Sequence, residues 1–122
     1  MKKILFIEDE RMIIDLLKDI LNSGECQCDF LSAFTITGAQ DILKKEKPDL
    51  ILLDLLLPDG YGLDLLKEIK ENKNLKDIPV LVLTNYTSKN GDERAKTLGA
   101  DEYLIKANLN PSEIVQKIKK YI

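Results

Sequence analysis

The sequence contains no histidine, and this absence excludes several kinds of chemistry. Histidine is the usual general base of enzymes, the commonest metal ligand and the side chain of phosphohistidine. A Ser-His-Asp hydrolase is therefore excluded, and so is a phosphorelay step in which this chain would carry its own phosphohistidine. Any phosphohistidine that serves this chain must belong to another protein.

Cysteine is also scarce, because Cys26 and Cys28 are the only two. Their i, i+2 spacing on a strand would place both side chains on one face, a poor basis for a disulfide framework or a four-ligand zinc site. We therefore expect two reduced structural thiols. Long apolar runs are missing as well: the first one covers only four residues before Glu8. This is far too short for a signal or membrane segment, so we expect a cytoplasmic protein.

Strong charge of either sign is absent, since the net charge is only −3. Nucleic acids and anionic membranes usually require a concentrated basic patch, so we expect neither as a direct partner. Hydrophobic residues make up 44% of the chain and charged residues 32%, as in folded globular proteins. A length of 122 residues is typical of one domain, and we treat residues 1–122 as a single domain.

Short β-rich runs alternate with segments of helical periodicity along the whole chain. Such alternation predicts parallel strands joined by helical crossovers, and near-continuous hydrophobicity predicts burial on both faces of the sheet. The predicted fold is α/β, a doubly wound five-stranded parallel sheet of the flavodoxin-like type with strand order 2-1-3-4-5. The predicted strands are Lys3–Ile7, Cys26–Leu31, Leu50–Leu53, Val80–Leu83 and Glu102–Ile105.

Five helices are predicted between and after these strands. The second helix should begin at Thr37, which forms a possible capping box with Gln40. A fourth helix from about Asn90 to Leu98 carries little apolar surface, and Gly99 can end it in the left-handed conformation. The last helix should have Asn110 as its N-cap. The first and third present apolar stripes, made by Ile13, Leu16, Leu17, Ile20 and Leu21, and by Leu63, Leu65, Leu66 and Ile69.

Polar residues follow four of the predicted strands directly. Because parallel strands end at one edge of the sheet, these residues should converge in a single cleft. The converging set contains three carboxylates, one hydroxyl and one ammonium: Glu8, Asp9, Asp54, Thr84 and Lys106. Any one of them could simply be a solvated loop residue. Together they predict a functional site.

Carboxylates that lie close together raise one another's pKa unless a cation is bound between them. Mg²⁺ is the natural candidate, because it prefers oxygen ligands and is held by one or two carboxylates together with phosphate oxygens. A carboxylate beside Mg²⁺, with an ammonium and a hydroxyl opposite, also has the parts that phosphoryl transfer to an aspartate requires.

The sequence resembles the receiver domains of bacterial two-component response regulators over essentially its whole length. Each matching motif is weak alone, but five in the right order are a strong signal. They are Ile4-Leu5-Phe6-Ile7-Glu8-Asp9-Glu10, Asp54-Leu55-Leu56-Leu57-Pro58-Asp59-Gly60, Leu83-Thr84, Gly99-Ala100-Asp101-Glu102-Tyr103 and Leu104-Ile105-Lys106.

The resemblance implies that Asp54 is the phosphoacceptor. Asp9 and the main-chain carbonyl of Leu56 would join it around Mg²⁺, and Glu8 would act directly or through water. The phosphoryl group would come from a separate histidine kinase or phosphotransfer protein, and the output would be an altered surface for a downstream protein. Enzymatic activity would be confined to the phosphorylation and dephosphorylation of the chain itself.

Three further roles come from the same resemblance. Lys106 would pair with the phosphoryl group, and Thr84 would reach over to a phosphoryl oxygen. Tyr103 would swing inward as Thr84 moves, which would alter the face made by the fourth helix, the fifth strand and the fifth helix. The plain alternative for Tyr103 is a half-buried strand aromatic.

The sequence departs from the family pattern in three places. Ala107 stands where most members have a proline after the lysine, and a cis bond before a non-proline residue costs about 2.5 to 4 kcal/mol, so we expect a trans bond and a differently shaped loop. Asn85 replaces a small residue and should narrow the access to Asp54. Leu56 and Tyr86 are bulky at positions that tune hydrolysis of the acyl phosphate, which favours slow dephosphorylation.

Two other functions remain open. The first is a constitutive interaction module with the same fold that is never phosphorylated. Relief of carboxylate repulsion separates it from the phosphoacceptor, because Mg²⁺ should then raise the melting temperature and Asp54→Asn should stabilise the metal-free protein. The second is a flavin-binding electron carrier. The acidic loop Glu8-Asp9-Glu10 disfavours it, since a phosphate-bearing cofactor requires Gly, Ser or Thr donors at that position.

Overall fold

The computed structural model describes residues 1–24, 27–86 and 90–122, and a parallel five-stranded sheet forms its centre. The strand order is β2-β1-β3-β6-β7, and every neighbouring pair in it is parallel. This is the predicted order 2-1-3-4-5, because β4 and β5 belong to a separate hairpin. The strands are β1 (Lys2–Ile7), β2 (Cys28–Ala33), β3 (Leu50–Leu53), β6 (Val80–Thr84) and β7 (Glu102–Ile105).

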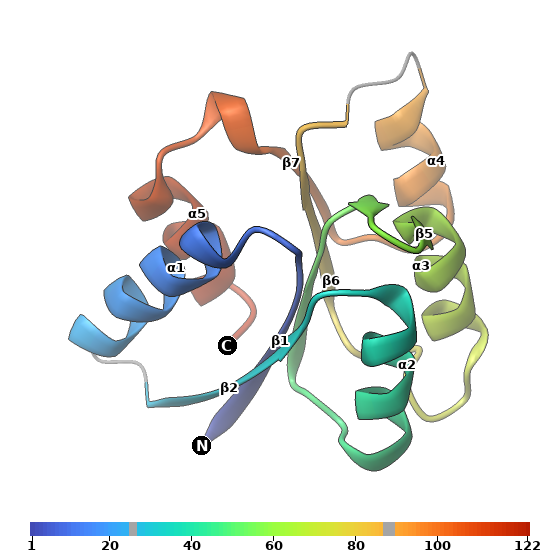
Figure 1. Ribbon diagram of the computed structural model, residues 1–122, viewed down its shortest axis with the longest axis horizontal. Helices are drawn as coiled ribbons and strands as arrows, with labels where there is room; N and C mark the ends of the chain where they lie inside the picture. Colours follow the sequence, from blue (N-terminus) through green and yellow to red (C-terminus); the bar gives the residue numbers. More distant parts are fainter. Residues whose placement is uncertain (25–26, 87–89) are drawn as a thin grey trace.

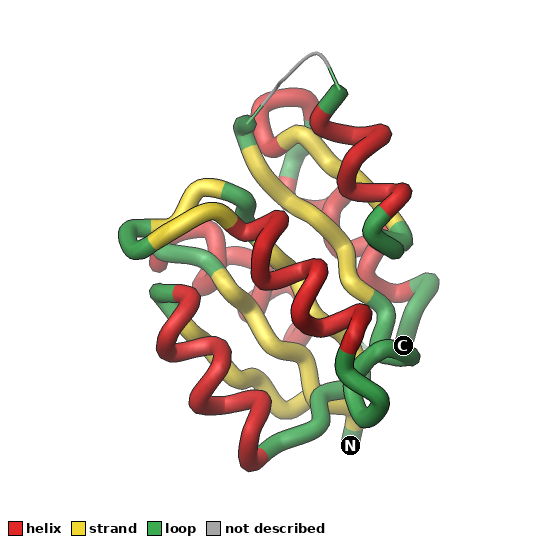
Figure 2. Tube along the Cα trace, turned by 90° about the vertical axis from the view of Figure 1, so that its right-hand side faces the viewer, coloured by secondary structure: helices red, strands yellow, loops and turns green. Residues whose placement is uncertain are grey.

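Helices cover both faces of the sheet, as a doubly wound fold requires (Figure 1). α1 and α5 lie on one face, and α2, α3 and α4 lie on the other; Figure 2 shows this second layer in front of the strands. No helix in the described part of the chain is both long and apolar enough to cross a membrane. The helices are α1 (Arg11–Ser23), α2 (Ile36–Lys45), α3 (Gly62–Glu71), α4 (Gly91–Thr97) and α5 (Pro111–Lys119).

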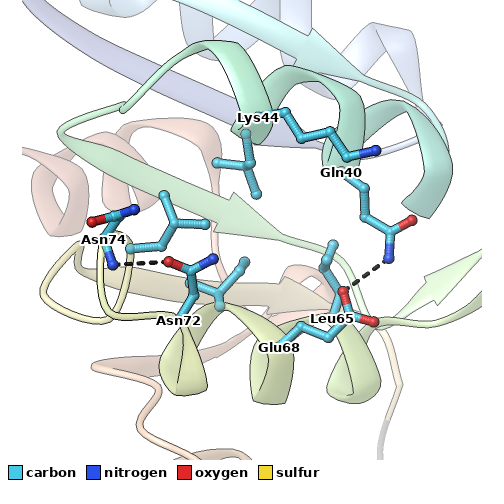
Figure 3. Close-up of a pocket in the computed structure, with 9 residues that line it drawn as sticks. Gln40, Lys44, Leu65, Glu68, Asn72 and Asn74 are labelled. Atoms are coloured by element: carbon cyan, nitrogen blue, oxygen red, sulfur yellow. Dashed lines mark hydrogen bonds between the residues drawn. The ribbon is translucent and has the colours of Figure 1, made fainter.

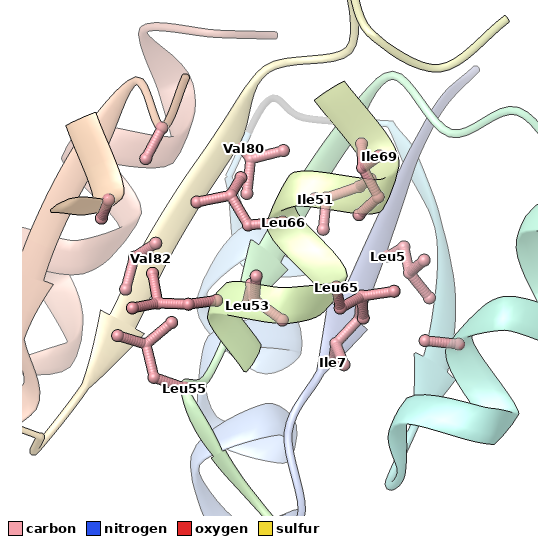
Figure 4. Packing of buried hydrophobic residues seen from close by; sticks show 14 of the residues in the cluster. Leu5, Ile7, Ile51, Leu53, Leu55, Leu65, Leu66, Ile69, Val80 and Val82 are labelled. Carbon is pink, nitrogen blue, oxygen red and sulfur yellow. The ribbon is translucent and has the colours of Figure 1, made fainter. Parts of the chain in front are cut away.

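The core consists of two hydrophobic layers, one on each side of the sheet. Side chains alternate along a strand, so Ile4 and Phe6 of β1 pack under α1 and α5, whereas Leu5 and Ile7 pack on the α3 side. Figure 4 shows the second layer, in which Leu66 of α3 and its neighbours lie over β1, β3 and β6. The predicted burial of the sheet on both faces is confirmed.

A short antiparallel hairpin follows β3 and was not predicted as strands. It consists of β4 (Leu56–Leu57) and β5 (Gly60–Tyr61), with Pro58 and Asp59 at its turn. The Asp59 carboxylate accepts hydrogen bonds from the backbone N–H groups of Ile36 (2.8 Å) and Thr37 (3.1 Å). These bonds lower the pKa of Asp59 and tie the hairpin to the first turn of α2.

Helix caps were predicted with mixed success. The Thr37–Gln40 box is wrong: Thr35 is the N-cap of α2 in an extended conformation, and its hydroxyl accepts from the Gly38 N–H at 2.9 Å. Thr37 lies inside the first turn, where its hydroxyl donates to Asp59 instead. The Asn110 cap of α5 is confirmed, as is the left-handed conformation of Gly99 (φ 107°).

The cysteine prediction is wrong for Cys28, which is disulfide-bonded at the start of β2. The predicted strand began at residue 26, whereas β2 is Cys28–Ala33. Cys26 itself lies outside the described residues.

Gly62 provides a test of the packing between α3 and the loop after β3. A Cβ at this position would lie 2.4 Å from the Asp54 carbonyl oxygen and 2.8 Å from the Leu55 Cα, so the backbone would have to move. We expect Gly62→Ala to lower the free energy of unfolding by about 1 to 3 kcal/mol in urea denaturation. Gly24→Ala is the matched control, because its nearest neighbour would be 3.6 Å away, and it should change stability by less than about 0.5 kcal/mol. Equal losses of stability in the two variants would contradict the close packing of Gly62 against the loop after β3.

Candidate functional site

The carboxyl ends of four strands meet at one edge of the sheet and bring together Glu8, Asp54, Thr84 and Lys106. All four side chains are buried, although they are polar or charged. Backbone bonds continue the sheet past the ends of the strands: the Glu8 N–H donates to the Ala33 carbonyl and the Asp54 N–H donates to the Ile7 carbonyl, both at 2.9 Å. The ladder therefore fixes the position of Glu8 beside Asp54. The predicted convergence is confirmed for these residues.

The Lys106 ammonium is shared among three carboxylates. It donates to Asp54 Oδ2 at 3.0 Å, forms an ion pair with Glu8 Oε1, and lies 3.3 Å from Glu10 Oε1. Glu8 and Asp54 are buried, whereas the Glu10 side chain is 60% exposed. One buried cation thus faces two buried anions, and Glu10 contacts it from the solvent side.

Both carboxylate oxygens of Asp54 accept hydrogen bonds. Oδ1 accepts from the Thr84 hydroxyl at 2.6 Å and from the Leu56 N–H at 3.2 Å, while Oδ2 accepts from Lys106. Donors from three segments therefore fix the plane of the carboxylate. The structure brings the Thr84 hydroxyl to the Asp54 carboxylate itself, on the oxygen opposite to the one that faces Lys106.

The environments of Glu8 and Asp54 shift their pKa values in opposite directions. Burial acts to raise the pKa of Asp54, but hydrogen bonds from Thr84, Lys106 and Leu56 outweigh it and hold this pKa below its ordinary value. Burial raises the pKa of Glu8 to about 7, because its bond to Lys106 offsets only part of that effect and the Asp54 charge adds to it. Burial acts to lower the pKa of Lys106, but its bonds to Glu8 and Asp54 raise it.

The predicted carboxylate repulsion therefore contributes to the raised pKa of Glu8 only as an effect smaller than burial, and for Asp54 the predicted rise is wrong. The physical reason is Lys106, a resident cation that the prediction had assigned to the phosphoryl group alone. Since the neighbours of Asp54 favour its charged form, the structure gives no support to a stabilising Asp54→Asn substitution in the metal-free protein.

The acidic residues at this edge fit a divalent metal ion. One carboxylate oxygen each from Glu8, Asp9 and Asp54 lies within 4.8 Å of the others. Asp9 is exposed and the other two are buried, so the cluster opens to solvent on the Asp9 side. An oxygen donor set with one open side suits a hard cation such as Mg²⁺, which retains waters and takes phosphate oxygens. Leu56, the fourth predicted ligand, is placed beside Asp54 by its N–H bond.

Asn85 and Ala107, two of the residues that depart from the family pattern, are joined by a hydrogen bond. No cis peptide bond occurs in the described ranges, which confirms the expected trans bond before Ala107. The Ala107 N–H donates to the Asn85 side-chain oxygen at 2.9 Å, and a proline at position 107 would have no N–H to donate. Lys106 begins a short 3₁₀ helix, η1 (Lys106–Asn108), that this bond attaches to the end of β6. Asn85 therefore holds the loop of Lys106.

Tyr103 lies on β7 and is half-buried. Its hydroxyl donates to the backbone carbonyl of Tyr86 at 2.6 Å. Tyr86 follows Thr84 by two residues, and its N–H donates to the Thr84 hydroxyl at 3.0 Å. Tyr103 is therefore connected to Asp54 through three hydrogen bonds, which join it to Tyr86, Tyr86 to Thr84, and Thr84 to Asp54.

Glu10 belongs to the first motif, but the sequence indicated no individual role for it. Glu10 is the N-cap residue of α1, and its N–H donates to Glu8 Oε2 at 3.2 Å. Glu10 and Lys106 are 96 positions apart in the sequence, so no local pattern indicates their contact. The only available signal was its position directly after the acidic pair.

A hollow of about 470 Å³ lies elsewhere, between α2 and α3 (Figure 3). Leu65 and Ile69 contribute to its lining, and Gln40 of α2 donates to Glu68 of α3 at 2.8 Å beside it. None of the residues that line it belongs to the cluster around Asp54. The hollow is therefore separate from the site at the strand ends.

Comparisons with known proteins agree with the fold. The sequence model of the response regulator receiver domain matches residues 4–119. The polar-differentiation response regulator DivK of Brucella ovis is 28% identical over 99% of this chain and 96% of DivK. The Mn²⁺-bound response regulator Rcp1 has a TM-score of 0.90 with 30% identity, covering 99% of this chain and 94% of Rcp1. The phosphorylated cyanobacterial phytochrome response regulator RcpA has a TM-score of 0.85 with 31% identity, covering 98% of this chain and 89% of RcpA.

A doubly wound α/β domain with buried acids and a lysine at its strand ends is the architecture of a phosphoacceptor domain. The chain belongs to the response regulator receiver domain family. It functions as a phosphoacceptor in two-component signalling, and its acidic cluster agrees with that function. A constitutive module that is never phosphorylated is not favoured.

Removal of Lys106 tests its role as the shared cation. Lys106→Met would leave the buried carboxylates of Glu8 and Asp54 without their partner, so we expect the free energy of unfolding to fall by about 3 kcal/mol. Lys117→Met is the control, since Lys117 forms a partly exposed pair with Glu102 at 3.7 Å, and its loss should cost less than about 1 kcal/mol. Urea denaturation measures both variants. Similar losses would show that the cluster does not depend on this charge.

The pH dependence of stability reports on Glu8. Its pKa in the folded chain is about 7, above the ordinary value of 4.5, so the folded chain binds this proton more tightly than the unfolded chain. The free energy of unfolding should therefore fall as the pH rises between these two values. Without histidine, few other groups titrate in this window. Urea denaturation in a chelator at about pH 5 and about pH 8 should reveal the fall, and Glu8→Gln should remove most of it. An unchanged slope in Glu8→Gln would contradict the assignment.

Proposed function

We propose that Asp54 accepts a phosphoryl group from the phosphohistidine of a partner histidine kinase or phosphotransfer protein. The observation that carries the proposal is the bonding of the Asp54 carboxylate to Lys106 and Thr84, beside two further acids. One carboxylate oxygen forms a bond to phosphorus while the bond from phosphorus to the imidazole nitrogen breaks. The electron pair of that bond leaves with the nitrogen.

The bonds to Asp54 suit this reaction. A pKa below the ordinary value keeps Asp54 ionised at neutral pH, so it is a nucleophile without a general base. Lys106 carries its full positive charge, because its pKa is raised, and it can pair with the oxygens of the transferred phosphoryl group. Thr84 donates to the same carboxylate and can donate to a phosphoryl oxygen after transfer. The chain acts only on its own aspartate in this scheme.

The acidic cluster is proposed to hold Mg²⁺ through Asp9, Asp54 and the Leu56 carbonyl, with Glu8 bound directly or through water. The ion would neutralise the carboxylates and the incoming phosphoryl oxygens. A Mn²⁺-bound form of Rcp1, which shares the fold and 30% of its sequence with this chain, supports a divalent cation here. The phosphorylated form of RcpA supports a phosphoryl group at the same kind of site.

The phosphoryl transfer from a histidine kinase also implies where the chain works and which surface it uses. Residues 1–122 act as one receiver domain in the cytoplasm, where histidine kinases present their phosphohistidine. Tyr103 and the surface of α4, β7 and α5 would then present the altered state to a downstream protein. The bond between Asn85 and Ala107 supports a working site, because it fixes the loop that carries Lys106.

Chemical phosphorylation tests the acceptor directly. Incubation with a small acyl phosphate and Mg²⁺ should add the mass of one phosphoryl group to the intact protein, and Asp54→Asn should show no gain. Asp59→Asn is the matched control, because Asp59 lies in the same loop but its carboxylate binds the start of α2, and it should still be phosphorylated. Phosphorylation of Asp54→Asn to the wild-type level would refute Asp54 as the acceptor.

Metal binding can be tested without any phosphodonor. An ion that binds only the folded chain stabilises it by mass action, by about 1.4 kcal/mol when its concentration is ten times its dissociation constant. Millimolar Mg²⁺ should therefore raise the melting temperature of the wild type in a saturable way. Asp9→Asn removes a ligand that is exposed, so it should abolish this rise without unfolding the chain. A rise of the same size in Asp9→Asn would exclude this ligand set.

A further inference from the structure

Three tyrosines from separate segments gather beside the site. Tyr61 belongs to β5, Tyr86 follows β6, and Tyr103 belongs to β7. All three are partly buried and pack against the core layer beneath α2, α3 and α4. The proposed function uses Tyr103 and leaves Tyr61 without a role.

Tyr61 is attached firmly to the loop that carries Asp54. It pairs with Leu56 in the β4–β5 hairpin, and the next residue, Gly62, donates its N–H to the Leu55 carbonyl at 2.7 Å. The backbone of Gly62 approaches Asp54 so closely that no side chain fits between them. The backbone position of Tyr61 is therefore set by the phosphoacceptor Asp54 and the two residues that follow it.

Tyr86 is the point at which these connections meet. Its N–H donates to the Thr84 hydroxyl at 3.0 Å, and its carbonyl accepts from the Tyr103 hydroxyl at 2.6 Å. Its ring meets the Tyr61 ring edge to face, with the centroids 5.3 Å apart and the planes at 80°. Such a pair stabilises beyond its buried area. Asp54 thus reaches Tyr86 by two routes, through the Thr84 side chain and through the hairpin and Tyr61.

We propose that Tyr61 is a positioning residue, which holds Tyr86 against the phosphoacceptor loop through the contact of their rings and thereby couples Asp54 to Tyr103. Because the Tyr103 hydroxyl donates to the Tyr86 carbonyl, a change in the position of the Tyr86 backbone also moves the Tyr103 hydroxyl. A shift of the Asp54 loop moves the hairpin, and the hairpin moves the Tyr61 ring. The part of this proposal that concerns phosphorylation rests on the proposed function of Asp54.

Amide hydrogen exchange without a phosphodonor tests the contact itself. The Tyr86 N–H exchanges when its bond to Thr84 opens, so Tyr61→Leu should speed this exchange about 2- to 12-fold, the equilibrium factor of an aromatic pair. Tyr61→Phe retains the ring and should stay within about 2-fold of the wild type. The control is Tyr121→Leu, which removes a tyrosine that packs in the other core layer and should leave Tyr86 unchanged.

Three results would overturn the role of Tyr61. The first is an unchanged rate at Tyr86 in Tyr61→Leu. The second is a change there no larger than that of the core amide of Leu52, which reports general destabilisation. The third is a Tyr61→Phe variant as fast as Tyr61→Leu, because the ring would then not be the element that positions Tyr86.

A second measurement tests the coupling to Tyr103. The wild type and Tyr61→Leu are treated with a small acyl phosphate and Mg²⁺, and intact mass establishes whether Asp54 is modified. When both are modified, the shift of the Tyr103 NMR signals on phosphorylation should be at least about 2-fold smaller in Tyr61→Leu. Equal shifts would overturn the coupling. No mass gain in either protein would refute the proposed function instead, and the exchange result would still decide the role of Tyr61.

Discussion

The ion pairs of Lys106 are the interaction on which the site depends. Glu8 and Asp54 are buried next to each other at the ends of neighbouring strands, and two buried carboxylates cannot both stay ionised without a compensating charge. Lys106 supplies that charge to both, and the result is unequal: Asp54 stays ionised and Glu8 has a raised pKa. A site built in this way holds a ready nucleophile beside an acid whose charge a metal ion would favour.

The same lysine links the chemistry to the rest of the fold. Its loop is fixed by the bond between the Ala107 N–H and the Asn85 side chain, and Asn85 directly follows Thr84. The segment that holds the lysine in place is therefore continuous with the segment that donates to Asp54 and accepts from Tyr103. Two of the residues that depart from the family pattern, Asn85 and Ala107, thus bind each other and fix the loop of Lys106.

Much of this architecture was predictable from local patterns. The five core strands and their order followed from apolar runs and alternation, and the residues after those runs were the ones that the sheet brought together. Local capping was less predictable. Thr35 and Thr37 are both suitable N-cap residues, and the choice between them is made by Asp59, which binds the Thr37 hydroxyl from a loop 22 residues away. The hairpin of β4 and β5 was missed because two-residue strands leave no periodicity to detect.

The sequence alone determined the class of fold, the convergence of Glu8, Asp54, Thr84 and Lys106, and the absence of histidine chemistry, because strand periodicity and the parallel direction of the strands are local properties with a geometric consequence. The tertiary structure decided the rest. The opposite pKa shifts of Glu8 and Asp54, the contact of Glu10 with Lys106 and the ring pair of Tyr61 and Tyr86 all depend on distances of a few ångströms between segments that are far apart in the chain. Electrostatic and packing interactions change steeply over such distances, and no pattern of residue types specifies them.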